Sequence, residues 1–273
     1  MKDLDRITCL AQRIRLHATR MVSMAKSSHL GGNFSMAEII AVLYGKILNV
    51  SPKRLDDPER DRFILSKGHA AAGYYAALAE CGFFPLEWLD SFYVDGARLA
   101  GHATRGIPGI EVSSGALGHG LPIAVGMALS AKYNNEKHRI FALLSDGECN
   151  EGSVWEAAMF AAQHKLDNLI CIIDYNKIQA LGYTKDVCGL EPFADKWNSF
   201  RWTVREVDGH NVEALVETLE SLPFELGKPN CVIAHTIKGK GVSFMEDQLL
   251  WHYRSPQGEE YQKAMKELEA NNL

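Results

Sequence analysis

Continuous apolar runs, each followed by polar residues, are clearest near the middle of the chain. One apolar run covers 140–144 and ends just before Asp146, and a second covers 169–173 and ends at Asp174, two residues before Asn176. A helical pattern over 151–165 separates the two runs. This order predicts two parallel strands joined by a crossover helix. The polar residues that follow the two strands should therefore lie side by side, in the crevice where open α/β sheets bind ligands.

In the rest of the chain, segments with a helical pattern also alternate with short apolar segments typical of strands. Apolar residues recur at helical spacing over 4–25, and 36–48 is apolar nearly all round, which predicts a buried helix. Ser35 would be the N-cap of that helix and Glu38 its partner in a capping box. The pattern predicts further strands at 63–65, 202–207 and 231–236, and further helices ending near residue 80 and at 121–132 and 211–221. We therefore expect an α/β fold, a parallel sheet flanked by helices on both faces.

Two loops and the C-terminal segment do not fit this alternation. Residues 27–33 are rich in turn formers, and 95–120 contains seven glycines. So long an irregular stretch in a compact domain is more often a functional loop than a connector. From about 255 the tail alternates acidic and basic residues, which is typical of a helix with a solvated surface.

Composition narrows the class of protein. The 273 residues allow one large domain or two small ones, and 47% hydrophobic and 23% charged residues are ordinary for a globular protein. A net charge of −5 does not favour nucleic-acid binding. There is no apolar run of about eighteen residues that would span a membrane, and the charged N-terminal stretch is unlike a signal peptide. Six scattered cysteines without a CxxC pair indicate a reduced, cytoplasmic protein.

The residues after the two central strands have the chemistry of a hard-cation site. Asp146, the Asn176 amide and the Ile178 carbonyl offer three oxygen ligands, which Mg²⁺ or Ca²⁺ commonly combines with phosphate oxygens and water. Gly147 would let the backbone approach a phosphate. An Asp-Gly pair alone is more simply a turn. The pairing of the two strand ends favours the functional interpretation.

The same stretch carries a family resemblance. Asp146-Gly147, Glu151-Gly152 and Asn176 resemble the thiamine pyrophosphate motif, which begins with GDG and ends in Asn, and the details are similar to transketolases. Ser145 replaces the first glycine of GDG. The resemblance implies a thiamine diphosphate-binding fold over 1–273, with Mg²⁺ (or Ca²⁺) held by the three oxygen ligands. It also places Gly147 and Asn176 beside thiamine pyrophosphate.

Two loops in the first third of the chain extend the resemblance. The segment around His29 resembles the SGHPG loop of transketolases, whose histidine faces the substrate, with Ser28 and Leu30 replacing Gly and Pro. Residues 62–70 resemble DRFxLSxGHA, which implies that Lys67 and His69 lie on the cofactor side. Without the resemblance, a loop histidine is usually solvated, and a lysine is usually on the surface.

The glycine-rich stretch resembles GHP…GPLGQG of the same family. By this resemblance His102 reaches the substrate, and the backbone of Gly115, Ala116 and Leu117 packs on the thiamine. Ala116 replaces the proline, and His119 replaces the glutamine and is given no role.

The last segment of the resemblance is KTxKGxG…ED…WH, matched by 235–252. It implies that Lys238 meets the diphosphate, for which an ammonium is a good partner. It also implies that His252 lines the substrate channel. Alone, the KGKG sequence would be an unspecific basic loop. The expected catalytic residues are thus His29, His102 and His252.

The resemblance covers nearly the whole chain but only the first domain of a transketolase. The family's middle domain supplies the glutamate that contacts the aminopyrimidine ring and most of the arginines for the sugar phosphate. We therefore expect the N-terminal subunit of a split transketolase, which forms an α2β2 assembly with a C-terminal transketolase subunit. It would transfer a glycolaldehyde unit between sugar phosphates. The donor and acceptor sugars stay open.

Three alternatives remain at this stage. A 1-deoxyxylulose 5-phosphate synthase and the alpha subunit of a 2-oxo acid dehydrogenase share the metal motif, although the SKGHA and KGKG…WH segments favour transketolase. A non-catalytic cofactor-binding module is the alternative from another class. An idle site would not need Asp146, Asn176, Lys238 and four histidines together.

Overall fold

A five-stranded, fully parallel sheet forms the centre of the protein. The computed structural model describes residues 3–270. The strand order is β1-β2-β3-β7-β6, so the last strand in the chain lies inside the sheet and not at its edge. The strands are β1 (Arg62–Leu65), β2 (Ile140–Ser145), β3 (Leu169–Tyr175), β6 (Thr203–Asp208) and β7 (Asn230–His235).

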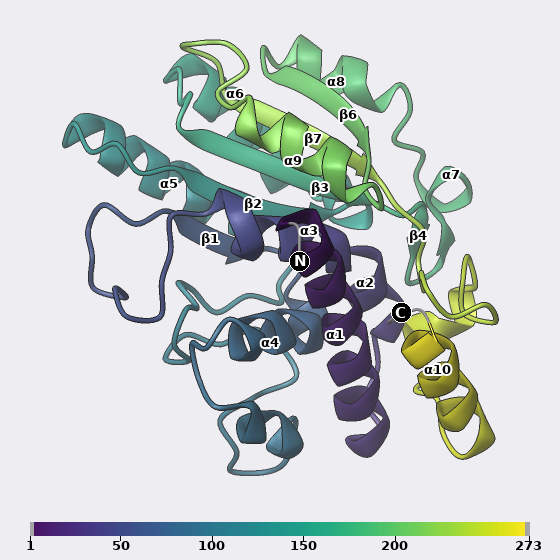
Figure 1. Cartoon of the computed structure of the whole chain (residues 1–273). Coiled ribbons are helices and arrows are strands. Elements are labelled where there is room, and N and C mark those ends of the chain that lie inside the picture. Colours follow the sequence, from purple (N-terminus) through teal and green to yellow (C-terminus); the bar gives the residue numbers. More distant parts are fainter. Residues whose placement is uncertain (1–2, 271–273) are drawn as a thin grey trace.

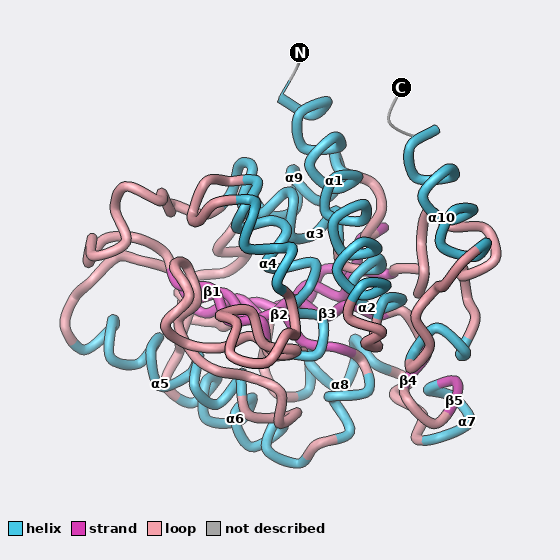
Figure 2. Tube along the Cα trace, turned by 90° about the horizontal axis from the view of Figure 1, so that it is seen from below, coloured by secondary structure: helices cyan, strands magenta, loops and turns pink. Residues whose placement is uncertain are grey.

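Helices cover both faces of the sheet, as Figure 2 shows with the sheet seen edge-on. One layer contains α1 (Asp3–Met24), α2 (Leu30–Ser35), α3 (Ala37–Val42), α4 (Ala71–Glu80) and α9 (Val212–Glu220). The other contains α5 (Gly120–Tyr133), α6 (Gly152–Gln163) and α8 (Phe193–Ser199). A hairpin of β4 (Ile178–Gln179) and β5 (Gly182–Tyr183), the short α7 (Thr184–Val187) and α10 (Glu259–Ala270) lie beside these layers (Figure 1). The expected fold class is confirmed.

Each central strand contributes to two separate cores. Phe141 and Leu143 of β2 face the α1 layer, whereas Ile140, Ala142 and Leu144 face the α5 layer. A strand that is buried on both faces needs a continuous apolar run, because neither set of alternate side chains reaches water. This is why β2 and β3 are visible in the sequence.

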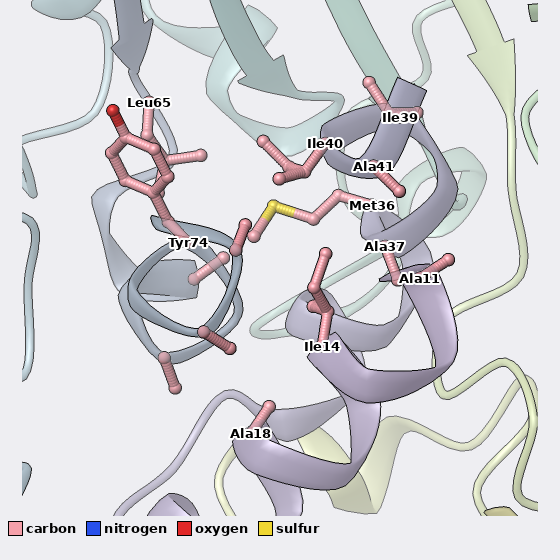
Figure 3. Close-up of a cluster of buried hydrophobic side chains, with 14 of the residues drawn as sticks. Ala11, Ile14, Ala18, Met36, Ala37, Ile39, Ile40, Ala41, Leu65 and Tyr74 are labelled. Atoms are coloured by element: carbon pink, nitrogen blue, oxygen red, sulfur yellow. The ribbon is translucent and has the colours of Figure 1, made fainter. Parts of the chain in front are cut away.

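The core of the α1 layer is packed from small and large residues in alternation. Figure 3 shows Met36 reaching from the start of α3 between Ile40 and Ile14, toward the helix that carries Tyr74. All four side chains are at most 1% exposed. Buried alanines on α1 and α4 let these two helices approach closely.

The predicted strand–helix–strand unit is confirmed. Strands β2 and β3 are parallel neighbours, with Ile140 opposite Leu169 and Ser145 opposite Asp174. The long stretch before α5 is irregular as expected, whereas α8 and the β4–β5 hairpin were not predicted. Each of these has seven residues or fewer, too short for a clear periodicity.

The capping prediction for 36–48 was wrong. Ser35 ends α2 instead of capping the next helix, and its hydroxyl donates to Asp174 at 2.6 Å and to the Gly32 carbonyl at 3.2 Å. Glu38 pairs with Arg15 on α1. The two side chains that would form a local capping box instead bind buried partners that are distant in the sequence. The turn-rich stretch before Ser35 is correspondingly helical from Leu30.

The prediction of a solvated tail was also incomplete. Helix α10 buries Ala264, Met265 and Leu268 in the same core as α1. Its apolar stripe is only three residues wide, so the surrounding charges hide it in the sequence. Across residues 3–270, none of the helices combines the length and apolar character needed to cross a membrane.

A buried polar chain connects α1 to the end of β7. Arg15 donates to both Glu38 oxygens at 2.6 Å, and Glu38 also contacts the Nδ1 atom of His210 at 2.9 Å. The Nε2 atom of His210 accepts the backbone N–H of Ile237 at 2.8 Å. Burial alone would raise the pKa of Glu38, but Arg15 and His210 outweigh burial and lower it to about 2.

This pKa predicts how the protein responds to acid. Because the folded-state pKa of Glu38 lies below its usual 4.5, its contribution is complete above pH 4.5 and is lost as pH falls toward 2. That contribution is about 3 kcal/mol. In Glu38→Gln, the free energy of unfolding measured in urea should lose this part of its pH dependence. An unchanged slope between pH 4.5 and 2 would contradict the assignment.

Candidate functional site

Four neighbouring strands deliver polar residues to one edge of the sheet. Lys67 follows β1, Asp146 follows β2, Asn176 follows β3 and Lys238 follows β7. They meet in a cavity of about 270 Å³. The expectation that Asp146 and Asn176 lie at adjoining strand ends is confirmed by the register of β2 and β3.

The cavity gathers nearly all the residues that the sequence had singled out. Its wall includes His29, Lys67, His69, His102, Gly115, Leu117, Asp146, Gly147, Asn176, Ile178, Lys238 and His252. Ala116 is the exception, since it is exposed and does not line the cavity. The sequence had not indicated Gly32, Ser145, Gln179, Ala180 or Tyr253, which also line it. Tyr253 adjoins His252, and that neighbourhood was the one available signal.

Asp146 is a buried carboxylate without a direct cationic partner. Its Oδ1 accepts the N–H of Gly147 at 2.7 Å and its Oδ2 accepts the N–H of Lys177 at 2.5 Å. Burial and the nearby Asp174 raise the pKa of Asp146 to about 7. Burial thus destabilises the charged form of this carboxylate. A cation bound in the cavity would stabilise the charged form, so the position is suited to a cation.

The other two expected ligands lie directly beside it. The Oδ1 atom of Asn176 accepts the N–H of Ile178 at 3.2 Å, and Lys177 between them has a φ of 67°, in the left-handed region. The Ile178 carbonyl accepts from the Lys238 ammonium at 2.7 Å. The Lys238 ammonium occupies one lone pair of this carbonyl oxygen, and the second lone pair could accept from a cation.

Within residues 3–270, no three His, Cys, Asp or Glu side chains are grouped closely enough to hold a metal ion. The oxygen set around Asp146 contains a single carboxylate, so it would need further ligands from a bound molecule. Phosphate oxygens are the usual partners of Mg²⁺ in such sites. The residues present therefore fit a metal that is bound together with a diphosphate.

Lys238 is the cation nearest to these oxygens. Besides the Ile178 carbonyl, its ammonium contacts the Nδ1 atom of His252 at 2.8 Å. Burial lowers the pKa of Lys238 to about 8, although Asp146 opposes the shift. A buried ammonium with few anionic partners is a strong binding group for an anion that enters the cavity.

Lys67 is fully buried, so it is not a surface lysine. Its ammonium donates to the Gly32 carbonyl at 2.9 Å and to the Oδ2 atom of Asp174. Burial alone would raise the pKa of Asp174, but the Lys67 ammonium holds it below its usual range. The two side chains form an ion pair at the cavity wall, with 1% and 0% of their side-chain surfaces exposed.

Asp174 accepts from three further residues. Ser35 at the end of α2 donates at 2.6 Å, Asn176 donates at 3.3 Å, and the hydroxyl of Thr236, after β7, donates to the Oδ1 atom. We call these five residues the Asp174 hub: Ser35, Lys67, Asp174, Asn176 and Thr236. The hub fixes the loops that carry the cavity residues relative to one another.

Four histidines also line the cavity. The ring centroid of His29 lies 5.1 Å from those of His69 and His252 and 6.4 Å from that of His102. Burial, followed by His102 and the two lysines, lowers the pKa of His29 to about 4. Burial and Lys238 lower the pKa of His252 to about 3, and burial lowers the pKa of His69 well below its usual value.

At neutral pH, His29, His69 and His252 are therefore neutral imidazoles. Each neutral ring offers one donor and one acceptor nitrogen. The backbone fixes the first of them, because His29 has a φ of 71° and donates its N–H to the His252 carbonyl at 2.8 Å. Such a cluster can exchange hydrogen bonds with the hydroxyl and carbonyl groups of a sugar.

Comparison with known families and proteins agrees with this geometry. The family described as "Transketolase, thiamine diphosphate binding domain" matches residues 7–270. An apulose-4-phosphate transketolase subunit from Actinobacillus succinogenes is 48% identical over 241 residues, covering 88% of this chain and 87% of that protein. The 6-deoxy-6-sulfo-D-fructose transketolase subunit SqwG of Clostridium sp. is 43% identical over 242 residues, covering 88% of each.

Solved structures give the same result for the fold. Transketolase from Leishmania mexicana superposes with a TM-score of 0.90 at 29% identity, over 98% of this chain and 42% of that one. Transketolase from Campylobacter jejuni gives 0.90 at 31%, over 98% and 43%. The chain thus spans less than half the length of these transketolases.

The Asp174 hub predicts a specific pattern of stabilities. Lys67→Met leaves Asp174 buried without a cation, and Asp174→Asn leaves Lys67 buried without an anion. Each should lower the free energy of unfolding by about 3–5 kcal/mol. The double variant should lose less than the two single losses added together, because it leaves no lone charge.

The control is Lys132→Met, which removes a surface ion pair with Asp167 and should cost at most about 1 kcal/mol. Denaturant unfolding of the four variants measures the coupling. Strictly additive losses for Lys67 and Asp174 would show that the buried pair does not act as a unit.

Proposed function

Because the chain belongs to the transketolase family, as a thiamine diphosphate-binding domain, we propose that it is the cofactor-binding subunit of a two-chain transketolase. The enzyme would transfer a two-carbon glycolaldehyde unit from a ketose phosphate to an aldose phosphate. One observation carries the proposal. A cation-type oxygen set, a buried ammonium and a cluster of histidines share one cavity at the carboxyl edge of the sheet.

The oxygen set and Lys238 would hold the two charged parts of the cofactor complex. Asp146, Asn176 and the Ile178 carbonyl would bind Mg²⁺, or Ca²⁺ in its place, and Lys238 would bind the diphosphate. The backbone beside Gly147 and the loop that includes Gly115 and Leu117 would contact the rest of the molecule. Thiamine diphosphate, when bound, supplies the reactive carbon that amino-acid side chains lack.

The chain's own contribution to the reaction would be proton handling and orientation. His29, His102 and His252 would hydrogen-bond the sugar's oxygens and hold or pass protons as the carbon–carbon bond changes, and His69 would contact the cofactor side. Neutral imidazoles can act in both directions, since each carries one proton and one free lone pair. Burial beside two lysines keeps His29 and His252 in that state at neutral pH.

A separate partner chain would complete the enzyme. Several of the similar proteins are themselves named as single subunits of a transketolase, and the solved transketolases are more than twice as long as this chain. We expect a C-terminal subunit that closes the cavity, two copies of each chain, and a cytoplasmic location that cell fractionation would check. The names of similar proteins point to substrates among sugar phosphates and their sulfonated counterparts.

The direct test follows the two-carbon unit. The chain and its partner would be mixed with thiamine diphosphate, Mg²⁺, an aldose phosphate and a ketose phosphate labelled with ¹³C at C1 and C2. We expect the label in a new ketose only when both chains are present, and none after removal of the metal with EDTA. Asp146→Ala should lower the rate by about 100-fold or more.

Asp195→Ala is the matched control, because Asp195 is exposed on α8 and does not line the cavity. Transfer by this chain alone would contradict the two-chain proposal. Condensation of pyruvate with an aldose phosphate, without ketose cleavage, would favour a 1-deoxyxylulose 5-phosphate synthase. Cofactor binding without any reaction would favour a non-catalytic module.

A further inference from the structure

A second buried carboxylate lies next to the cavity without lining it. Glu148 is fully buried, two residues after Asp146. Its Oε1 atom accepts from the Ser66 hydroxyl and from the N–H of Gly118 at 2.9 Å, and its Oε2 atom accepts the N–H of Ser145 at 3.3 Å. These three donors are uncharged and come from three different segments of the chain.

The peptide groups before and after Gly118 are both hydrogen-bonded to side chains. Glu148 accepts its N–H, and the Ser153 hydroxyl, from the first turn of α6, donates to its carbonyl at 2.7 Å. Gly118 has a φ of +79°, and a Cβ there would lie 2.5 Å from the Ser153 oxygen and 2.6 Å from the Glu151 Cβ. The loop is thus gripped at a position that only glycine can occupy.

This grip lies immediately after the part of the loop that faces the cavity. Gly115 and Leu117 line the cavity wall, one to three residues before Gly118. Gly115 also packs on His102, since a Cβ there would lie 2.8 Å from that ring. Any displacement of Gly118 would therefore move cavity-lining backbone.

Glu148 also ties this loop to the turn after β1. Ser66 precedes Lys67 of the Asp174 hub, and a Cβ on Gly120 would lie 2.2 Å from the Ser66 hydroxyl. The two loops touch again at Gly68, where a Cβ would lie 2.7 Å from the Gly115 nitrogen. The two loops are thus in direct contact, and Glu148 accepts hydrogen bonds from both of them.

We propose that Glu148 is a positioning residue that fixes the 115–118 loop at the distance from the metal-side residues that thiamine diphosphate requires. Only a carboxylate can do this, because it accepts hydrogen bonds on both oxygens, whereas an amide would turn an N–H toward one of the three donors. The inference rests on the proposed function. In this proposal, Glu148 supports binding of the organic part of the cofactor and not of the diphosphate.

The test compares two ligands on the two-chain complex. In Glu148→Gln, the Kd for thiamine diphosphate with Mg²⁺ should rise by about 10–100-fold, as for other groups that orient a binding residue. The Kd for inorganic pyrophosphate with Mg²⁺ should change by less than about threefold, since Asp146, Asn176 and Lys238 remain. Ser153→Ala, which releases the other side of the Gly118 peptide, should weaken only thiamine diphosphate as well.

Asp61→Asn is the matched control. Asp61 is also a buried carboxylate with backbone and arginine donors, but it precedes β1 at the opposite edge of the sheet. This variant should lower Tm and leave both affinities unchanged.

The outcomes separate a failure of the positioning role of Glu148 from a failure of the proposed cofactor-binding function. Unchanged thiamine diphosphate affinity in folded Glu148→Gln, or equal weakening of both ligands, would overturn the positioning role. If Glu148→Gln fails to fold, Ser153→Ala decides by the same comparison. A wild-type complex that binds neither ligand would overturn the proposed function itself.

Discussion

The ion pair between Lys67 and Asp174 is the interaction on which the site depends. Both side chains are buried at the point where four parallel strands end, and Asp174 accepts from residues on four segments. A buried ion pair seldom stabilises a protein more than well-packed apolar residues would. Its effect here is positional, because α2, the turn after β1 and the loops after β3 and β7 share one acceptor. The loops that carry His29, Asn176 and Lys238 thus meet with little freedom.

The charges around the cavity form two groups that differ in how they are compensated. Lys67, in the cavity wall, and Asp174 behind it neutralise each other, whereas Asp146 and Lys238 face the cavity with few direct partners of opposite charge. Burial raises the pKa of Asp146 and lowers the pKa of Lys238, so it favours the neutral form of each side chain. A cation bound with a polyanion would reverse both shifts at once. These charges would therefore suit a metal diphosphate, while burial keeps His29, His69 and His252 beside them neutral by lowering the pKa of each ring.

The sequence predicted the parts of this structure that have a strong local pattern. β2, α6 and β3 follow from two apolar runs and a helical spacing, and the position of Asp146 beside Asn176 follows from the parallel pairing. The histidines and Lys238 had no such signal, because loop residues carry no periodicity, and only the family resemblance singled them out. Ser35 and Glu38 were misassigned because buried partners distant in sequence determine their contacts. Nothing in the spacing near Asp146 indicated that Glu148 turns inward to bind two other loops.

The most direct measurement is calorimetry of thiamine diphosphate with Mg²⁺, on this chain alone and on this chain with its partner. If the chain provides the metal and diphosphate half of a shared site, it should bind weakly alone and at least about tenfold more tightly in the complex. Equally tight binding by the chain alone would contradict the account, because the cavity would then be a complete cofactor site.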